Sequence, residues 1–301
     1  MALYTKQSGK LKELKEKPFK LEKDIQNIFE QNLSTIMGFE LIKSEFSIKN
    51  KRIDTLAYDV QAFAFIIIEY KRDKNISVID QGFTYLSLML ENKADFMIEY
   101  NESLKRNLKR EDVDWSQTRV AFVSPSFTEN QIQATNFKDI AIDLWEIKQY
   151  ENETISINPI KKSVSAESIK PLAQKTPSFK IVTTEIKVYT EQDHIEKASD
   201  LIAELYEKFK KAILNITDGI EIKPQKFYVA FKKGKNLTDI AILKKSLKLF
   251  INLKVGQLDD PRKLALDVSN IGHWGNGDYQ IQVEDDKNLE YIMSLVKQVI
   301  Q

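Results

Sequence analysis

Three polar residues that can support hydrolytic chemistry lie on two neighbouring segments, RIDTLAYD and AFAFIIIEYK. Glu69 and Lys71 are two residues apart, and residues two apart in a β-strand point to the same side. The preceding segment carries Asp54, and the short connection between the segments predicts a hairpin. Burying an acid and a lysine at the end of an apolar strand is costly unless they are paired or bind a cation. We therefore expect Asp54 and Glu69 to converge around a cation.

Two carboxylates, supplemented by water and a backbone carbonyl, are the ligands that Mg²⁺ prefers. The carbonyl of Tyr70, between Glu69 and Lys71, is the expected further protein ligand. In phosphodiester hydrolysis, Mg²⁺ or Mn²⁺ bound there polarises the phosphate and lowers the pKa of a bound water. Lys71 then positions that water or neutralises the charge that develops on the phosphate. These residue types predict a metal-dependent phosphodiester hydrolase.

The elements that position these residues follow from the hydrophobic pattern. Apolar residues at helical spacing predict a helix between Pro18 and Gly38. The unbroken apolar run of AFAFIIIEYK predicts a strand that is buried on both faces. The other predicted elements are a strand-turn-strand in EFSIKNKRIDTLAYD, helices at residues 80–90, 101–111 and in TENQIQATNF, and strands in KADFMIEY, TRVAFVSPSF and IAIDLWEIKQY. Their order predicts an α/β domain with a mixed sheet between helices.

In that order the segments resemble the PD-(D/E)xK nuclease superfamily, which has an acid on one strand and E-x-K on the next. Gln81 and Tyr85, in QGFTY, are similar to the Q-xxx-Y motif of RecB-like members. The resemblance covers about residues 15 to 150 and implies a restriction-endonuclease-like fold. It implies that Gln81 and Tyr85 organise the metal site or the DNA backbone from the helix after the E-x-K strand. It also implies a glutamate from the first helix near the site, for which Glu22 is the best match. Ile53 stands where the family's nominal proline would be.

Two domains are predicted. Residues 1–158 form the nuclease-like domain, and residues 188–301 form a smaller α+β domain. Between them, residues 159–187 combine prolines, serines and lysines without periodicity, which is typical of a linker. The second domain resembles an uncharacterised C-terminal domain of bacterial proteins that carry such a nuclease half, including a family once labelled "predicted transport protein". We expect it to bind substrate or to form a homodimer.

Some features of the second half have two interpretations. Residues 270–279, NIGHWGNGDY, have glycines and Trp274, which fit close approach to a partner and base stacking. Gly-Asn-Gly-Asp is equally typical of a hairpin turn, and the hairpin is favoured. Eight lysines between residues 226 and 254 accompany a single acid, Asp239, and a smaller basic cluster lies at residues 105–110. Solvated surfaces are favoured for both clusters.

Composition limits the class of protein. Cysteine is absent, which excludes disulfides and thiolate chemistry, and two histidines make a histidine-rich zinc site a poor fit. The net charge of +1 requires any nucleic-acid surface to come from local patches. There is no run of about 18 apolar residues and no apolar signal core, so we expect a cytoplasmic protein without membrane contact. There is no Walker pattern for nucleotide hydrolysis.

Three functions are compatible with these features. The leading hypothesis is a Mg²⁺-dependent nuclease acting on DNA in restriction, phage defence or repair. The alternative is a catalytically inactive nuclease-fold module that binds DNA or a partner. A third is a regulatory protein whose second domain senses a ligand. In the simplest structural interpretation, Asp54, Glu69 and Lys71 form only a buried salt-bridge network, which is a poor source of stability.

Overall fold

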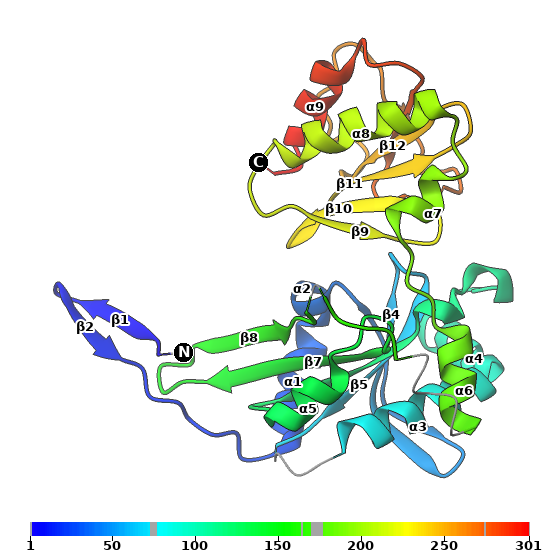
Figure 1. The fold of residues 1–301 in the computed structure, drawn as a ribbon. Helices are drawn as coiled ribbons and strands as arrows, with labels where there is room; N and C mark the ends of the chain where they lie inside the picture. The colour runs from blue at the N-terminus through cyan, green and yellow to red at the C-terminus, as the bar shows by residue number, and fades with distance from the viewer. Residues whose placement is uncertain (1, 73–76, 164, 170–176, 274, 301) are drawn as a thin grey trace. The chain divides into compact units, whose positions relative to one another are not determined.

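The computed structural model describes residues 2–72, 77–163, 165–169, 177–273 and 275–300. The chain divides into two compact units, Met1–Val188 and Tyr189–Gln301, called here the N-terminal and C-terminal units (Figure 1). None of the described helices combines the length and the apolar composition that crossing a bilayer would need.

A six-stranded mixed sheet forms the centre of the N-terminal unit. Its strands, in spatial order, are β3 (Glu40–Ile48), β4 (Lys51–Asp59), β5 (Ala64–Tyr70), β6 (Arg119–Ser124), β7 (Ile142–Gln149) and β8 (Ile155–Ile160). β5, β6 and β7 are parallel to one another, and the other neighbouring strands are antiparallel. The predicted strand-turn-strand of residues 45–59 and the hairpin from β4 to β5 are confirmed.

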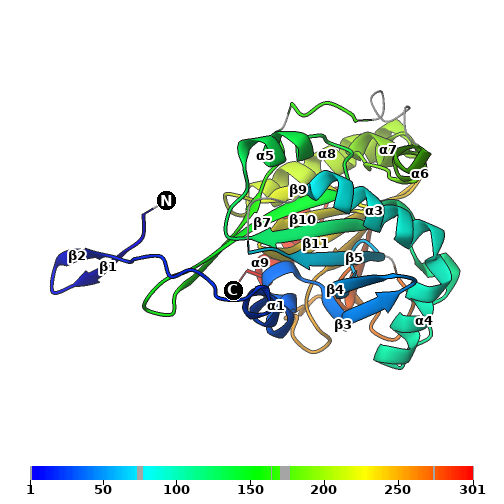
Figure 2. The ribbon, with the colours of Figure 1, turned by 90° about the horizontal axis from the view of Figure 1, so that it is seen from below.

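β5 separates two hydrophobic cores because its side chains alternate between the two faces of the sheet. Ile66, Ile68 and Tyr70 pack on the face called here the α1 face, and Phe65 and Ile67 pack on the opposite face, called the α3 face. α1 (Glu22–Gln31) and α2 (Leu33–Met37) cover the α1 face. The α3 face carries α3 (Val78–Glu91), α4 (Lys93–Leu104), α5 (Glu129–Thr135) and α6 (Pro177–Glu185), with short 3₁₀ turns at Arg110–Asp112 and Trp115–Gln117. Figure 2 shows α1 and α3 on opposite sides of the sheet.

Three expectations for the N-terminal unit are corrected. The helix predicted over residues 101–111 is only the end of α4, which stops at Leu104, before the 3₁₀ turn at Arg110–Asp112. KADFMIEY, predicted as a strand, is part of α4, because Phe96 and Tyr100 are four residues apart and both are buried. The described part of residues 159–187, predicted as a linker, folds onto the N-terminal unit. Ile169, Val182 and Ile186 are buried in the core of the α3 face, and α6 packs against α3. A segment rich in proline and serine therefore contains a helix whose side chains are part of the core.

A two-stranded hairpin precedes this body. β1 (Tyr4–Gln7) and β2 (Lys10–Glu13) pair only with each other among the described strands. Both Figures 1 and 2 show this hairpin standing away from the sheet. The chain that follows is fixed to the β7–β8 turn, because Lys17 N–H donates to the Gln149 carbonyl (2.8 Å) and Glu151 N–H donates to the Lys15 carbonyl (3.1 Å).

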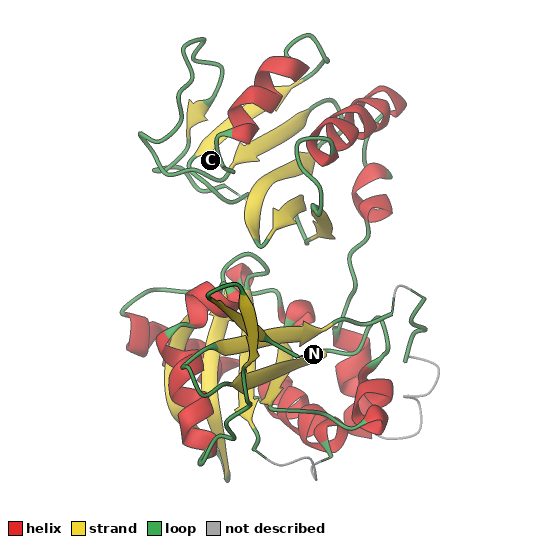
Figure 3. Cartoon of the chain, turned by 90° about the vertical axis from the view of Figure 1, so that its left-hand side faces the viewer, coloured by secondary structure: helices red, strands yellow, loops and turns green. Residues whose placement is uncertain are grey.

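The C-terminal unit is a smaller α+β structure with its own core. Its antiparallel sheet has the order β13 (Leu266–Asp267), β14 (Tyr279–Val283), β12 (Leu247–Ile251), β11 (Lys235–Ile242), β10 (Val229–Lys233) and β9 (Glu221–Pro224). α8 (Asp200–Leu214) and α9 (Leu289–Lys297) cover one face, after the short α7 (Glu191–Ile195) (Figures 1 and 3). The predicted fold class, a mixed sheet flanked by helices plus a smaller α+β domain, is confirmed.

The hairpin interpretation of residues 270–279 is also confirmed. These residues connect β13 to β14, which pair in an antiparallel ladder. His273 stacks on Phe250, with ring centroids 5.6 Å apart, and Asn276 donates from its backbone and side chain to the buried Asp239 carboxylate. The segment therefore packs on its own sheet. Trp274 lies outside the described residues.

Candidate functional site

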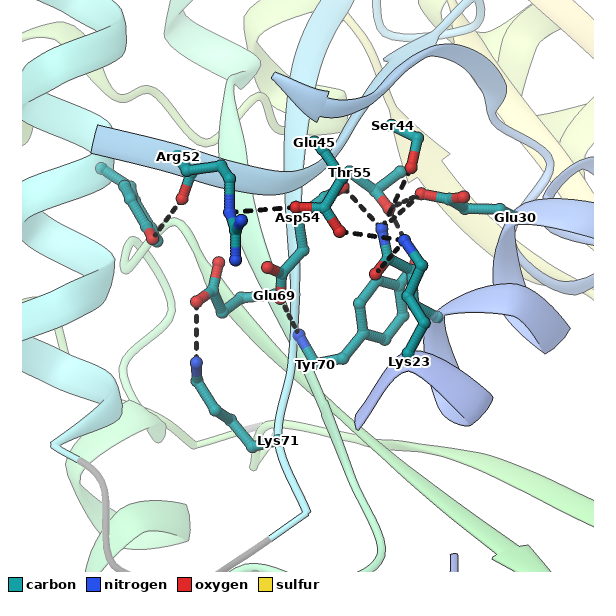
Figure 4. A network of polar contacts seen from close by, with 12 residues as sticks. Lys23, Glu30, Ser44, Glu45, Arg52, Asp54, Thr55, Glu69, Tyr70 and Lys71 are labelled. Atoms are coloured by element: carbon teal, nitrogen blue, oxygen red, sulfur yellow. Dashed lines mark hydrogen bonds and ion pairs between the residues drawn. The ribbon is translucent and has the colours of Figure 1, made fainter. Parts of the chain in front are cut away.

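The two predicted carboxylates lie next to each other where β4 and β5 separate. The last pair of the β4–β5 ladder is Thr55 with Ile68, so Asp54 and Glu69 are the next residues on the two strands. The neighbouring β3 is irregular here, because Glu45, between the residues that pair with Ile53 and Thr55, has a φ of 54°, an uncommon conformation for a residue with a side chain. Figure 4 shows the side chains of Asp54 and Glu69 pointing into a common space.

Glu69 is held by donors from its own strand and from α3. Its Oε1 accepts hydrogen bonds from Lys71 Nζ at 2.7 Å and from Gln81 Nε2 at 2.8 Å. Ser77 caps α3 by accepting from the Asp80 N–H, which places Gln81 in the first turn. Only 5% of the Glu69 side chain and 14% of the Lys71 side chain are exposed. Shielding from water strengthens such charge-assisted hydrogen bonds, so Lys71 is held on the acid.

Asp54 is held in a position where its charge is unfavourable. Its Oδ2 accepts a hydrogen bond from the Tyr70 N–H at 3.0 Å. Burial and, to a smaller extent, the neighbouring Glu69 carboxylate raise the pKa of Asp54 to about 6. The N–H and C=O of one strand residue point to the same edge, so the Tyr70 carbonyl also faces the β4 side. The structure therefore brings the two carboxylates together at the end of the β4–β5 ladder.

Tyr85 ties α3 to β4 beside these acids. Its hydroxyl accepts from Gln81 Nε2 (3.3 Å) and donates to the Arg52 carbonyl (3.3 Å). Burial and the Glu69 charge raise the pKa of Tyr85 to about 12, so the phenol keeps its proton and acts as a donor near neutral pH. Gln81 and Tyr85 thus lie on the helix after the E-x-K strand and contact the site, as the family resemblance implies.

Glu22 is placed differently from the other predicted site residues. Its Oε1 accepts a hydrogen bond from the Arg72 N–H at 3.0 Å, and the Arg72 guanidinium donates to the Lys20 carbonyl. The Glu22 contact is therefore to the backbone two residues after β5 ends. It anchors the start of α1 to the strand that carries Glu69.

Gln26, which sequence reasoning missed, links α1 to β4. It is 3% exposed, and its Nε2 donates to the Asp54 carbonyl (2.8 Å), to Glu30 (2.9 Å) and to Ser44 (3.2 Å). Glu30 in turn accepts from the Thr55 hydroxyl. Figure 4 shows Glu30, Ser44 and Thr55 of this network beside Asp54. Glu22, Gln26 and Glu30 recur every four residues and so lie along one side of α1, but this spacing alone does not show that Gln26 is buried.

The donor set is compatible with a hard divalent cation. Glu69 Oε2 is buried and accepts no hydrogen bond from any described residue. A buried carboxylate oxygen without a partner is costly, and a cation would relieve both this cost and the repulsion between Asp54 and Glu69. Within the described ranges, no group of three or more His, Cys, Asp or Glu side chains is arranged to hold a metal. The site therefore offers two carboxylates, and Mg²⁺ commonly takes its other ligands from carbonyl groups and water.

Fold and site together define the N-terminal unit as a mixed α/β domain with two carboxylates and a lysine at the carboxyl-terminal edge of β5. The chain belongs to the same family as a Haemophilus influenzae protein described as "Uncharacterized protein". The two are 57% identical over 301 residues, a match that covers all of this chain and 99% of that protein. Residues 191–299 match the family described as "Domain of unknown function (DUF5655)".

Two solved structures resemble part of the chain. One is described as "Structure of EndoMS-dsDNA2 complex", with 16% identity, a TM-score of 0.30 and coverage of 43% of this chain and 47% of that one. The other is a repair endonuclease from Pyrococcus abyssi, with 20% identity, a TM-score of 0.26 and coverage of 44% and 50%. The chain spans about half the length of these two proteins, and at such TM-scores the likeness does not define a shared fold.

Proposed function

We propose that the N-terminal unit is a Mg²⁺- or Mn²⁺-dependent nuclease that hydrolyses phosphodiester bonds in DNA. The observation that carries this proposal is Glu69 Oε2, buried without a hydrogen bond from the described residues, beside Asp54, whose pKa is raised to about 6. Two buried acids that repel each other and leave an oxygen unsatisfied are unfavourable without a cation. Lys71, held on Glu69, adds the positive charge that a phosphate ester requires.

Each residue has a defined role in this proposal. Asp54, Glu69 and the Tyr70 carbonyl would hold the metal, which would polarise the phosphate and lower the pKa of a bound water. Lys71 orients the attacking water or stabilises the charge on the phosphate oxygens. Gln81 and Tyr85 hold Glu69 and the Arg52 carbonyl in position. Glu22 and Gln26 fix α1 to the ends of β5 and β4, so they are positioning residues.

The nuclease proposal is tested with the purified full-length protein on a panel of single- and double-stranded DNA and RNA, with Mg²⁺, Mn²⁺ or EDTA. We expect metal-dependent cleavage that falls by about 100-fold or more in Lys71→Met and Asp54→Asn, since each removes a group required in the transition state. Asp95→Asn is the matched control, because Asp95 is an exposed acid in the first turn of α4. It should retain full activity.

Metal binding gives a second measurement that does not depend on cleavage. Mg²⁺ should raise the midpoint of thermal unfolding of the wild-type protein and of Asp95→Asn, but not of Asp54→Asn, because only a ligand that binds the folded state stabilises it. Full activity of Lys71→Met and Asp54→Asn would remove the proposed mechanism. DNA binding without carboxylate-dependent Mg²⁺ affinity would instead support the alternative of an inactive nuclease-fold module.

The wider setting follows from the same proposal. DNA restriction, phage defence or repair in the cytoplasm would use such an activity. The C-terminal unit would then contribute substrate contacts or homodimer formation. Measuring the molecular mass in solution of the full-length protein and of a chain without this unit would separate these two roles. A dimer that becomes a monomer without the unit would assign it to homodimer formation.

A further inference from the structure

The β1–β2 hairpin is exposed to an extent that a structural role does not explain. All eight of its strand residues are exposed or half-buried, with Tyr4 53% and Leu11 70% exposed. An isolated two-stranded hairpin is at best marginally stable in water. Its base is nevertheless fixed to the β7–β8 turn through Lys15, Glu16 and Lys17. The hairpin is thus an arm held at its base with two free faces.

The arm and its base are basic compared with the rest of the chain. The hairpin, residues 4–13, contains three lysines and one glutamate, a charge of +2. Residues 14–20 add three lysines and one glutamate, whereas the whole chain has a net charge of +1. The remaining residues are therefore net acidic. A local concentration of positive charge on a projecting element favours a polyanionic partner.

The ladder register separates the charges of the arm between its two faces. Thr5 pairs with Lys12 and Gln7 pairs with Lys10, so these four side chains share one face, which carries no acid. The opposite face carries Tyr4 with Glu13 and Lys6 with Leu11. One side of the ribbon therefore presents two cations with a hydroxyl and an amide, the groups that contact phosphates and base edges in nucleic acids.

We infer that the β1–β2 hairpin is a DNA-binding arm that enters the major groove of double-stranded DNA, with Lys10 and Lys12 contacting phosphates. The major groove of B-form DNA is wide enough to admit a two-stranded β-ribbon. The major groove of duplex RNA is deep and narrow and does not admit side chains in this way. The inference deepens the proposed function, since it names duplex DNA as the substrate of the Asp54–Glu69 site.

Three cationic side chains also line a pocket at the base of the arm. A pocket of about 430 Å³ lies between the base of the arm and the segments that follow β5 and β6, and its lining combines Lys17, Lys20 and Arg72 with Glu16. Arg72 is adjacent in sequence to Lys71 and is fixed by Glu22 and the Lys20 carbonyl. Lys17, Lys20 and Arg72 thus extend the basic surface from the base of the arm to the segment that follows β5.

The lysines between residues 226 and 254 fit this role less well. The antiparallel topology places Lys244 and Lys245 at the β11–β12 turn and Lys233 and Lys235 at the opposite end of β11, so the cluster is divided. Lys254 also pairs with Asp278 at 3.7 Å. The arm concentrates its charge on one ribbon.

The test measures binding of the full-length protein to a labelled duplex of about 30 base pairs in EDTA, over a range of salt concentrations, so that cleavage is not required. For Lys10→Ala/Lys12→Ala, we expect affinity to fall roughly tenfold to a hundredfold near about 0.1 M salt, and the slope of log K against log salt to fall by about 2. Lys208→Ala/Lys287→Ala is the charge-matched control, because both lysines are exposed and paired with Asp286 and Asp285. It should bind like the wild type.

Methylation of guanine N7 by dimethyl sulfate reports on the groove, since N7 lies in the major groove. The wild-type protein should protect N7 positions, and the double variant should not. Unchanged affinity and protection in the double variant would overturn the inference, as would tighter wild-type binding to single-stranded DNA or duplex RNA. A change of molecular mass in the double variant would assign the arm to a second copy of the chain. If duplex binding depended on the arm but no Mg²⁺-dependent cleavage occurred, the DNA-binding role of the arm would be supported and the proposed nuclease activity would be contradicted.

Discussion

The buried charge of Asp54 lowers the stability of the folded protein when no cation is bound. Its pKa, raised to about 6, exceeds the ordinary value because the charged form is buried beside Glu69. The folded state therefore binds a proton more tightly than the unfolded state. The favourable contribution of protonated Asp54 is present below pH 4 and is lost as the pH rises through about 6. Above that pH, without a cation, the folded protein carries an unfavourable charge.

We therefore expect Asp54→Asn to stabilise the protein near pH 8 in EDTA. Asn removes the charge and keeps an oxygen that can accept from the Tyr70 N–H. The gain should be about 1–2 kcal/mol, allowing for partial exposure of the group. Urea unfolding at pH 8 and at pH 4 measures the difference, which should shrink toward zero at the lower pH. A variant that is less stable than the wild type at pH 8 would contradict the electrostatic account.

Residue types and spacing predicted most of the site but not its support. Asp54, Glu69 and Lys71 could be found because E-x-K ends an apolar strand and an acid precedes it by one hairpin. Glu22 was expected near the acids, yet it accepts a hydrogen bond from the Arg72 N–H. Its position in the helix alone does not determine which group its side chain contacts. Gln26 was missed, since a buried amide in α1 has no distinct signature until β4 is placed beside it.

Among the elements, α3 lies unusually close to the sheet, and this closeness positions Gln81. Gly82, the next residue, faces the sheet, and a Cβ placed there would lie 2.5 Å from Ile142 Cδ1 and 3.4 Å from Phe122 Cε2. Both neighbours are fully buried. A methyl group at this position must therefore push α3 away from β6 and β7 or displace Ile142. Either change would alter the hydrogen bond from Gln81 to Glu69.

Gly82→Ala should therefore destabilise the N-terminal unit and lower its cleavage rate. Overpacking costs about 1–3 kcal/mol, which exceeds the gain of about 1 kcal/mol from replacing glycine by alanine within a helix. Thr84→Ala is the matched control, since Thr84 is exposed on the same helix and its hydroxyl bonds only to the Asp80 carbonyl among the contacts described. Urea unfolding and a cleavage assay compare the two. Greater stability in Gly82→Ala would show that the helix adapts.

Predictability at the scale of elements depended on how strongly the periodicity was expressed. β5 was predictable because its apolar run has core on both faces. α4 was not, because Phe96, Met97, Ile98 and Tyr100 resemble a strand when read in sequence, although Ile98 is 54% exposed. The helical spacing of Phe96 and Tyr100 was the correct signal. Only the packing of Phe96 on Phe46 and Phe65 distinguishes this helical pattern from a strand pattern.

At the scale of the whole molecule, each unit has its own core, and the boundary between them is set by burial. Composition predicted an open linker over residues 159–187, since prolines, serines and lysines rarely specify a packed helix. α6 instead adds Val182 and Ile186 to the core of the α3 face, and Lys162 Nζ donates to the Ile140 carbonyl at 2.6 Å. Such contacts are long-range, so no local pattern reports them.

The position of this boundary predicts different outcomes for two truncations. A chain of residues 1–188 should unfold cooperatively with the stability of the N-terminal unit, whereas residues 1–158 should be strongly destabilised. Among the described residues, the shorter chain loses three buried apolar side chains, each of which contributes about 1.5–3 kcal/mol. In the full-length protein, Val182→Ala should cost stability because Val182 is 2% exposed, while its neighbour Ile181, 44% exposed, should tolerate alanine. Thermal and urea unfolding of the four proteins measure this. If both truncations were equally stable and Val182→Ala did not change stability, residues 159–187 would be a linker, as the composition predicted.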